Sequence, residues 1–390
     1  MIAYLDNSAT TRVLPEVADT VYKCMTQDYG NPSSLHTLGF EAEKIVKSAR
    51  ETIASTLKVN EKEILFTSGG TESNNLSLIG SAIAGKRRGK HIVTTCIEHA
   101  SVYNPLLALE KEGYEITFLN VDSRGHIDLS ELEAALRDDT VLVSIMHVNN
   151  EIGSTEPVAE AGDIIKKKNK DIIFHVDAIQ SYGKLVIRPA KQNIDLLSVS
   201  GHKIYGPKGI GFLYIKSGTK LSPIIFGGGQ QNDMRSGTEN VPGIAGLAMA
   251  ASVCYDHLDE KMDELYQKRA YLCKKLQELE GVTINGAGAD PDADRSCFAP
   301  HIVSASFADV RAEVLLHALE EKGVYVSSGS ACSSNHPAIS GTLKAIGVKE
   351  KLLDSTVRFS LCSHTSYEEL DYAAACVAEL LPALRRFVRH

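Results

Sequence analysis

The sequence predicts an α/β fold: a large domain around a mostly parallel sheet, and a smaller α+β domain. The chain has 390 residues, which exceeds the length at which a single hydrophobic core usually stops growing. From about residue 40 to 215, short apolar runs alternate with helical patterns, as in parallel sheets covered by helices on both faces. This alternation stops after Gly243, where a different arrangement begins.

The elements of the large domain follow one another in strand–helix order. The run Ile172-Ile173-Phe174 is wholly apolar, as expected of a strand that is buried on both faces. The expected strands are 63–67, 91–95, 115–119, 141–147, 172–176 and 196–198. The expected helices between them are 41–57, 101–112, 130–136 and 158–168.

The second domain begins after a long helical run, 244–279, which carries a dense charged stripe. We interpret this run as a connector into the smaller domain. We expect a large domain of residues 15–255 and a small domain of residues 1–14 and 256–390. The elements expected in the small domain are strands 303–307, 324–327 and 357–361, and helices 312–322 and 368–388.

Composition excludes several classes of function. A net charge of −8 and a pI near 5.9 argue against a dedicated nucleic-acid or anionic-membrane binder. No window approaches 18 continuous apolar residues, and the first residues lack the leader of a signal peptide. We expect a cytoplasmic protein. The eight cysteines form no C-x-x-C pair, so we expect reduced thiols and no metal site.

A glycine-bearing turn, Ser68-Gly69-Gly70-Thr71, follows an expected strand and opens a helix. Such a turn presents main-chain N–H groups and the positive end of a helix to an anion, which suits a phosphate. It matches neither of the common nucleotide-binding glycine patterns. Because many turns of this kind bind nothing, Gly70 and Thr71 indicate a phosphate site only together with other residues.

Asp177 stands at the end of the apolar strand expected at 172–176. The carboxyl ends of parallel strands line the ligand crevice, and a carboxylate there needs a cationic partner. The protonated pyridine nitrogen of pyridoxal phosphate is such a partner. The alternative is an aspartate that caps the following helix.

Lys203 lies about 25 residues later, between two apolar segments. A lysine among apolar neighbours has a lowered pKa and becomes a usable amine for a covalent bond to a carbonyl. Ser200 and His202 can bond a phosphate. A lysine that extends its ammonium to water is the ordinary alternative, but the order of phosphate turn, Asp177 and Lys203 favours pyridoxal phosphate.

Three further side chains suit the same cofactor. His99 follows the expected strand 91–95, and its neutral imidazole can stack on the pyridine ring, although structural histidines are as common. Asn150 can donate to the ring hydroxyl or to a substrate carboxylate. Arg358, on an expected strand of the small domain, can bind an amino-acid carboxylate through two hydrogen bonds, unless it is an exposed strand arginine.

Cys332 differs from the other cysteines in its surroundings. It stands in Ser327-Ser328-Gly329-Ser330-Ala331-Cys332, a small and polar segment without a core pattern. We expect an exposed thiol on a flexible loop, able to approach a substrate sulfur and to move away with it. Such chemistry requires a thiolate fraction near neutral pH.

With these pieces in place, the chain resembles the cysteine desulfurases of fold-type I, in the class V aminotransferase superfamily, over nearly its whole length. The resemblance is carried by the segments Tyr4–Thr11, Gly30–His36, Ser68–Asn75, His147–Gly153, Ser198–Gly209 and Phe226–Thr238, and by the loop of Cys332. This form of the loop resembles the group that serves iron–sulfur cluster and thiolation pathways. The resemblance implies a seven-stranded sheet in the large domain.

The resemblance also implies roles for individual residues. Lys203 would hold pyridoxal phosphate covalently and move a proton at the substrate α-carbon. Asp177 would pair with the ring nitrogen, Gln180 with the ring oxygen, and His99 would stack on the ring. The phosphate would contact Gly70, Thr71, Ser200 and His202, as well as Thr238 from the neighbouring subunit of a homodimer with shared sites. The substrate would contact Asn31, Asn150 and Arg358, and Cys332 would attack the sulfur of L-cysteine.

The sequence departs from this family at Cys362 and Ser363, where Gly-Arg is usual, and in the C-terminal tail that docks the family's scaffold protein. These departures leave the sulfur-acceptor protein open. Selenocysteine lyase or aminotransferase activity remains an alternative within the superfamily, and a catalytically silent scaffold remains one outside it. Cys332 favours the desulfurase, because transamination needs no thiol.

Overall fold

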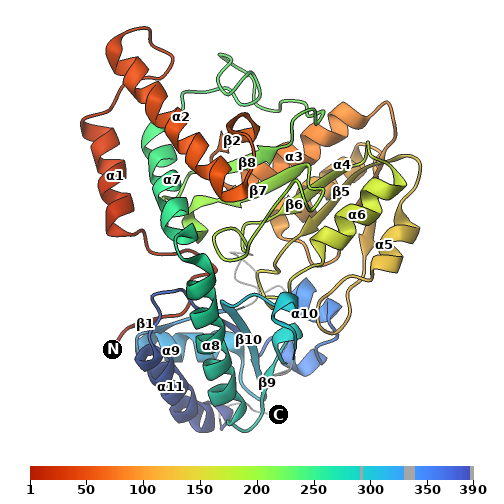
Figure 1. Cartoon of the computed structure of the whole chain (residues 1–390). Coiled ribbons are helices and arrows are strands. Elements are labelled where there is room, and N and C mark those ends of the chain that lie inside the picture. The colour runs from red at the N-terminus through yellow and green to blue at the C-terminus, as the bar shows by residue number, and fades with distance from the viewer. Residues whose placement is uncertain (290–292, 329–338, 387–390) are drawn as a thin grey trace.

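The computed structural model describes residues 1–289, 293–328 and 339–386, and its centre is a seven-stranded sheet (Figure 1). The strand order is β2-β8-β7-β6-β5-β3-β4. All neighbouring strands are parallel except that β8 runs antiparallel to β2 and β7. The predicted mostly parallel sheet is therefore confirmed. The strands are β2 Ile64–Thr67, β3 His91–Thr95, β4 Glu115–Leu119, β5 Thr140–Met146, β6 Ile173–Asp177, β7 Leu196–Ser200 and β8 Gly211–Ile215.

Helices cover both faces of this sheet. Successive residues of a strand point to opposite faces, and they pack into two different hydrophobic cores. Ile173 packs with the core that includes α3 and α4, whereas the next residue, Phe174, packs with the core of α2, α6 and α7. Likewise, Leu142 packs with the core of α3 and α4, and Val143 packs with the core of α2, α6 and α7. The helices are α1 Pro15–Thr26, α2 Thr37–Leu57, α3 Gly70–Gly85, α4 Ala100–Lys111, α5 Leu129–Ala135, α6 Val158–Lys168 and α7 Val241–Tyr255.

A second core lies below the large sheet, around a four-stranded antiparallel sheet of order β12-β13-β10-β9 (Figure 1). The N-terminal strand β1 Ala3–Tyr4 joins it by pairing with β11 Val324–Tyr325. This arrangement matches the expected α+β character, while the domain boundaries at 14/15 and 255/256 stay a prediction. The remaining elements are α8 Leu258–Gln277, β9 Val282–Ile284, β10 Ile302–Phe307, α9 Ala312–Glu321, β12 Ser327–Ser328, α10 Gly341–Ala345, β13 Thr356–Ser360 and α11 Tyr367–Arg385.

Two of the sequence-based expectations were wrong in detail. The run 244–279 is not one helix: α7 ends at Tyr255 and α8 begins at Leu258, with His257 between them at φ 50°. The two helices belong to different cores, so the chain must turn where the buried face changes. The expected strand 324–327 is two strands, because β11 pairs with β1 and β12 pairs with β13.

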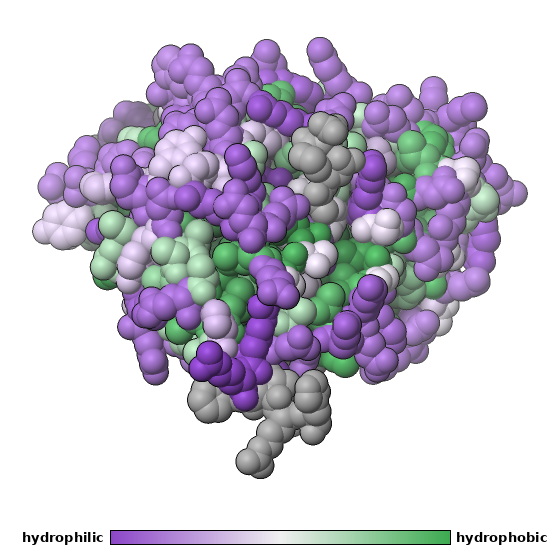
Figure 2. All heavy atoms as spheres, turned by 90° about the horizontal axis from the view of Figure 1, so that it is seen from below, coloured by the Kyte–Doolittle hydropathy of each residue, from purple (hydrophilic) through white to green (hydrophobic). Residues whose placement is uncertain are grey.

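No helix among the described residues is both long enough and apolar enough to cross a bilayer. Seen from below, apolar residues gather near the middle of the face and hydrophilic residues surround them (Figure 2).

Candidate active site

A cavity of about 330 Å³ lies at the carboxyl ends of β5, β6 and β7, which is where ligands bind in open α/β sheets. The second core closes it through Ser327, Ser328 and Arg358, and the N-terminal segment contributes Ser8 and Ala9. Ten residues expected from the sequence line this one cavity: Gly70, Thr71, His99, Asn150, Asp177, Gln180, Ser200, His202, Lys203 and Arg358.

Three expected residues are not brought into the cavity by the described chain. Asn31 and Thr238 are exposed and do not line it. The contact of Thr238 with a neighbouring subunit stays a prediction, since a single chain does not test it. Cys332 lies outside the described residues, but Ser327 and Ser328, four to five residues before it, form part of the cavity wall.

The turn before α3 has the properties of an anion site. Gly69 has a φ of 147°, a conformation that a residue with a Cβ rarely adopts, and no side chain caps the helix that follows. A Cβ on Gly70 would lie 2.1 Å from Cδ1 of Ile179, so a larger residue there would force the Ile179 side chain to move. The uncapped N–H groups of α3 and its positive end thus lie beside Ser200 at the cavity wall.

Asp177 is buried at the end of β6, with its carboxylate held from two sides. The N–H of Ile179 donates to Oδ1 (2.9 Å), and Nδ2 of Asn74 donates to Oδ2 (2.8 Å). Burial raises the pKa of Asp177, while the Ile179 hydrogen bond and the nearby His99, Asn74 and Lys203 oppose that shift. The site therefore contains a carboxylate that a cationic ligand group would stabilise.

Lys203 reaches the cavity from a short 3-10 turn, Gly201–Lys203, directly after β7. Its ammonium donates to the main-chain carbonyls of Ser8 and Ala9, the latter at 2.7 Å. The neighbouring His202 is half-buried, and burial together with the charge of Lys203 lowers its pKa to about 4. At neutral pH His202 is thus an uncharged ring beside the anion-binding turn.

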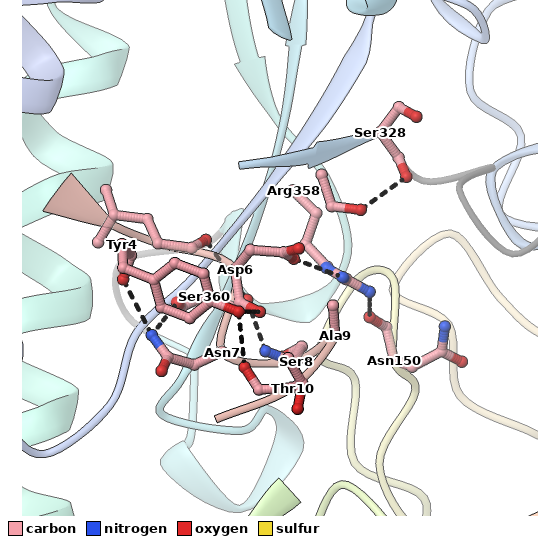
Figure 3. Close-up of polar contacts among 12 residues, drawn as sticks. Tyr4, Asp6, Asn7, Ser8, Ala9, Thr10, Asn150, Ser328, Arg358 and Ser360 are labelled. Carbon is pink, nitrogen blue, oxygen red and sulfur yellow. Dashed lines mark hydrogen bonds and ion pairs between the residues drawn. The ribbon is translucent and has the colours of Figure 1, made fainter. Parts of the chain in front are cut away.

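Arg358 of β13 connects the two cores at the cavity (Figure 3). Its Nη1 donates to the carbonyl of Asn150 (2.8 Å), and its Nη2 pairs with Oδ1 of Asp6 (3.0 Å). Nε is buried and has no hydrogen-bond partner among the residues that the structure describes. A buried donor without a partner costs free energy. This guanidinium is therefore suited to donate a hydrogen bond to an anionic ligand group.

Glu98 belongs to the site's support and was missed as such from the sequence, although it directly precedes His99. Its Oε1 accepts hydrogen bonds from Thr95 Oγ1 (2.8 Å) and from the N–H of Met146 (2.9 Å). Its Oε2 is buried without a partner in the described part of the chain. Burial raises the pKa of Glu98 to about 8, so this carboxyl is largely protonated at neutral pH.

This shift predicts a pH-dependent stability. A carboxyl whose pKa is raised in the folded state stabilises the fold below pH 4.5, and that contribution is lost as the pH rises through 8. Glu98→Gln keeps an oxygen acceptor and cannot ionise, so we expect it to be more stable than wild type above pH 8, by up to a few kcal/mol. Urea unfolding at pH 5, 7 and 9 measures the difference.

The control for this prediction is Glu278→Gln, at an exposed position just after α8. Its free energy of unfolding should equal that of wild type at all three pH values. Glu156 also has a pKa raised to about 8 by burial, so the single variant reduces the pH slope without removing it. If the free energy of unfolding changed with pH equally in Glu98→Gln and in wild type, the carboxyl of Glu98 could not be un-ionised in the folded protein.

The residues of the cavity fit pyridoxal phosphate as a set. An anion-binding helix end, a buried carboxylate, a lysine amine and an imidazole converge on a space of suitable size. Among the described residues, no group of three or more His, Cys, Asp or Glu side chains could hold a metal ion.

Comparisons with known proteins point to the same chemistry. The family model described as aminotransferase class-V matches residues 3–373. The chain belongs to this family, among its cysteine desulfurases. One relative, cysteine desulfurase IscS of Dictyoglomus turgidum, is 43% identical over 383 residues, covering 98% of this chain and 95% of that protein.

Solved structures of similar proteins share the fold over nearly the whole chain. A NifS-like protein is 38% identical, with a TM-score of 0.92 over 98% of this chain and 100% of its own. SspA in complex with cysteine is 34% identical, with a TM-score of 0.79 over 93% of this chain and 100% of its own. The fold-type I architecture expected from the sequence is thereby confirmed.

Proposed function

We propose that this class-V aminotransferase relative converts L-cysteine to L-alanine with pyridoxal phosphate and takes the sulfur onto Cys332. One observation carries the proposal: Lys203, Asp177 and the Gly70 turn, which come from separate segments, line a single cavity. Family membership supports it, because the curated relatives are cysteine desulfurases.

The cofactor's place follows from the chemistry of the donors. Its phosphate would lie at Gly70, Thr71, Ser200 and His202, and its ring between His99 and the carboxylate of Asp177. Gln180 would donate to the ring oxygen; in the structure its Nε2 donates to the carbonyl of Ser8 (3.1 Å). When bound, pyridoxal phosphate supplies an electron-withdrawing ring that stabilises negative charge on the substrate's α-carbon.

The chain's own groups would handle the substrate. Arg358 binds the carboxylate of cysteine through its partnerless Nε, and Asn150 lies beside it. The amine of Lys203 takes the proton from the α-carbon. The thiolate of Cys332 attacks the substrate sulfur: a sulfur–sulfur bond forms, the substrate's carbon–sulfur bond breaks, and protonation at that carbon gives alanine. The products are alanine and a persulfide on Cys332.

The reach of Cys332 is set by covalent geometry. It stands four residues after Ser328, and a chain spans at most about 3.6 Å per residue. Its Cα is therefore within roughly 14 Å of a residue in the cavity wall. This limit supports Cys332 as the sulfur acceptor over the cysteines buried in helices, such as Cys254 and Cys376.

The wider setting is part of the same proposal. A homodimer would bring Thr238 of one subunit to the phosphate held by the other, and Asn31 would contact the substrate. A sulfur-acceptor protein, in an iron–sulfur or thiolation pathway of the cytoplasm, would take the persulfide onward. Selenocysteine lyase activity is the nearest alternative, and the same assay with selenocysteine in place of cysteine distinguishes it.

The test of the proposed function is product analysis with the purified holoenzyme and L-cysteine. We expect alanine in stoichiometric amounts with sulfide when a thiol reductant is present, and no more than about one alanine per active site rapidly without it. Pyruvate instead of alanine, or a transamination product, would contradict the proposal.

Arg358→Lys tests substrate recognition separately. A lysine keeps the charge but cannot form two parallel hydrogen bonds to a carboxylate. A hydrogen bond to a charged group contributes about 1.5–3 kcal/mol, so we expect KM for cysteine to rise by roughly 10–100-fold. Steady-state kinetics measure this. Arg295→Lys, outside the cavity, is the matched control and should leave KM unchanged.

A further inference from the structure

A continuous chain of side-chain hydrogen bonds connects Asp177 to His99. It begins at Oδ2 of Asp177, to which Nδ2 of Asn74 donates (2.8 Å). The same Nδ2 donates to Oγ of Ser101 (2.9 Å), and Oγ of Ser101 lies 2.8 Å from Nδ1 of His99. Three elements supply these residues: the end of β6, the first turns of α3 and the start of α4.

The direction of each bond in this chain is determined by chemistry. A carboxylate only accepts, and an amide nitrogen only donates, so both hydrogens of Asn74 Nδ2 are used. Since Ser101 Oγ accepts from Asn74, its own hydroxyl proton is available for His99 Nδ1. The main-chain N–H of Ser101 also donates to this nitrogen (3.1 Å). With two donors directed at it, Nδ1 cannot itself carry a proton.

We propose that Asn74 and Ser101 are positioning residues that hold His99 as the neutral tautomer with its proton on Nε2, and that they link this ring to Asp177. The inference rests on the proposed function for its catalytic meaning. In that setting His99 would face the cofactor ring as an uncharged imidazole, and the carboxylate of Asp177 would keep its negative charge for the ring nitrogen.

The burial of Asn74 supports this assignment of donors. Its side chain is fully buried, and its Oδ1 has no partner among the residues described. Turning the amide around would place Oδ1 against the carboxylate of Asp177, where two acceptors face each other without a hydrogen. The fold tolerates a partnerless acceptor at this position, which indicates that both donors of Nδ2 are needed.

The experiment is nitrogen NMR of the full chain with 15N-labelled histidine, with and without bound pyridoxal phosphate. His99→Gln identifies the resonances of His99. In wild type we expect the Nδ1 signal of an unprotonated nitrogen and the Nε2 signal of a protonated one. In Ser101→Ala and in Asn74→Ala the main-chain N–H of residue 101 still donates to Nδ1, so we expect both signals to shift only part of the way toward the average of the two tautomers.

Ser77→Ala is the matched control. Like Ser101→Ala it removes a buried hydroxyl, and like Asn74 it lies on α3; its hydroxyl donates to the carbonyl of Ser73 (2.8 Å). It should leave the signals of His99 unchanged. A proton on Nδ1 in wild type would overturn the proposal, and so would an unshifted tautomer in both Ser101→Ala and Asn74→Ala. The wild-type measurement alone remains decisive if a variant does not fold.

The outcome is separable from that of the proposed function. The tautomer is measured without substrate, so the expected signals would stand even if the chain failed to release alanine from cysteine. Conversely, desulfuration by an enzyme whose His99 carries its proton on Nδ1 would overturn only the role of Asn74 and Ser101.

Discussion

Lys203→Ala is expected to abolish the visible absorbance band of the lysine-bound cofactor and to reduce alanine formation at least 10²–10⁴-fold, the usual contribution of general acid–base catalysis. In the proposed function the lysine has two tasks, because its amine would both bind the cofactor and move the substrate's α-proton. Its amine reaches the cavity, where it donates to the carbonyls of Ser8 and Ala9. Absorbance spectra and alanine assays on the purified variant measure the two effects.

Another lysine near the site does not duplicate this role. Lys184 donates to the main-chain carbonyl of Lys203 (3.1 Å), and burial lowers its pKa to about 8. It does not line the cavity, and its amine is hydrogen-bonded to the turn that carries Lys203. We therefore expect no residual band from Lys184 in Lys203→Ala.

Lys208→Ala is the control for this prediction. Lys208 lies five residues further along the same segment, is exposed, and does not line the cavity. The variant should retain the band and the alanine yield of wild type. A band that persists in Lys203→Ala would remove Lys203 from its proposed role and direct attention to a different amine.

Much of the fold and of the site followed from local sequence patterns. The strands around Asp177 and Ser200 are short, apolar and bounded by turns, so their existence was predictable. In a parallel sheet the residues after such strands meet at one edge. That rule alone brings Asp177, Lys203 and His99 together, although they are separated by up to about one hundred positions.

What the sequence did not reveal depends on contacts between distant segments. Asn74 was visible only as one residue of a turn, and its bond to Asp177 spans 103 positions. The pairing of Arg358 with Asp6 spans 352 positions and needs β1 to join the second core. Periodicity describes one helix at a time, so it could not show that α7 and α8 bury their faces in different cores.

Cys332→Ser is expected to retain the cofactor band but to lose nearly all release of alanine and sulfide from L-cysteine. A serine hydroxyl is not ionised near neutral pH and cannot accept sulfur, whereas a thiolate can. Lys203 and Asp177 are unchanged in this variant, so the step at the α-carbon should survive. Exchange of the α-proton of cysteine with solvent deuterium, followed by NMR, measures that step on its own.

Two other cysteines make this prediction specific to one thiol. Cys297 is partly exposed and does not line the cavity, so Cys297→Ser should behave as wild type. Cys362 lines a separate small cavity, which also contains Lys184 and shares Lys203 with the site, and it accepts a hydrogen bond from Thr365 (3.5 Å). If Cys332→Ser turned over at the wild-type rate while Cys362→Ser did not, the sulfur would leave through Cys362, and the persulfide would have to form in the small cavity that Cys362 lines with Lys203.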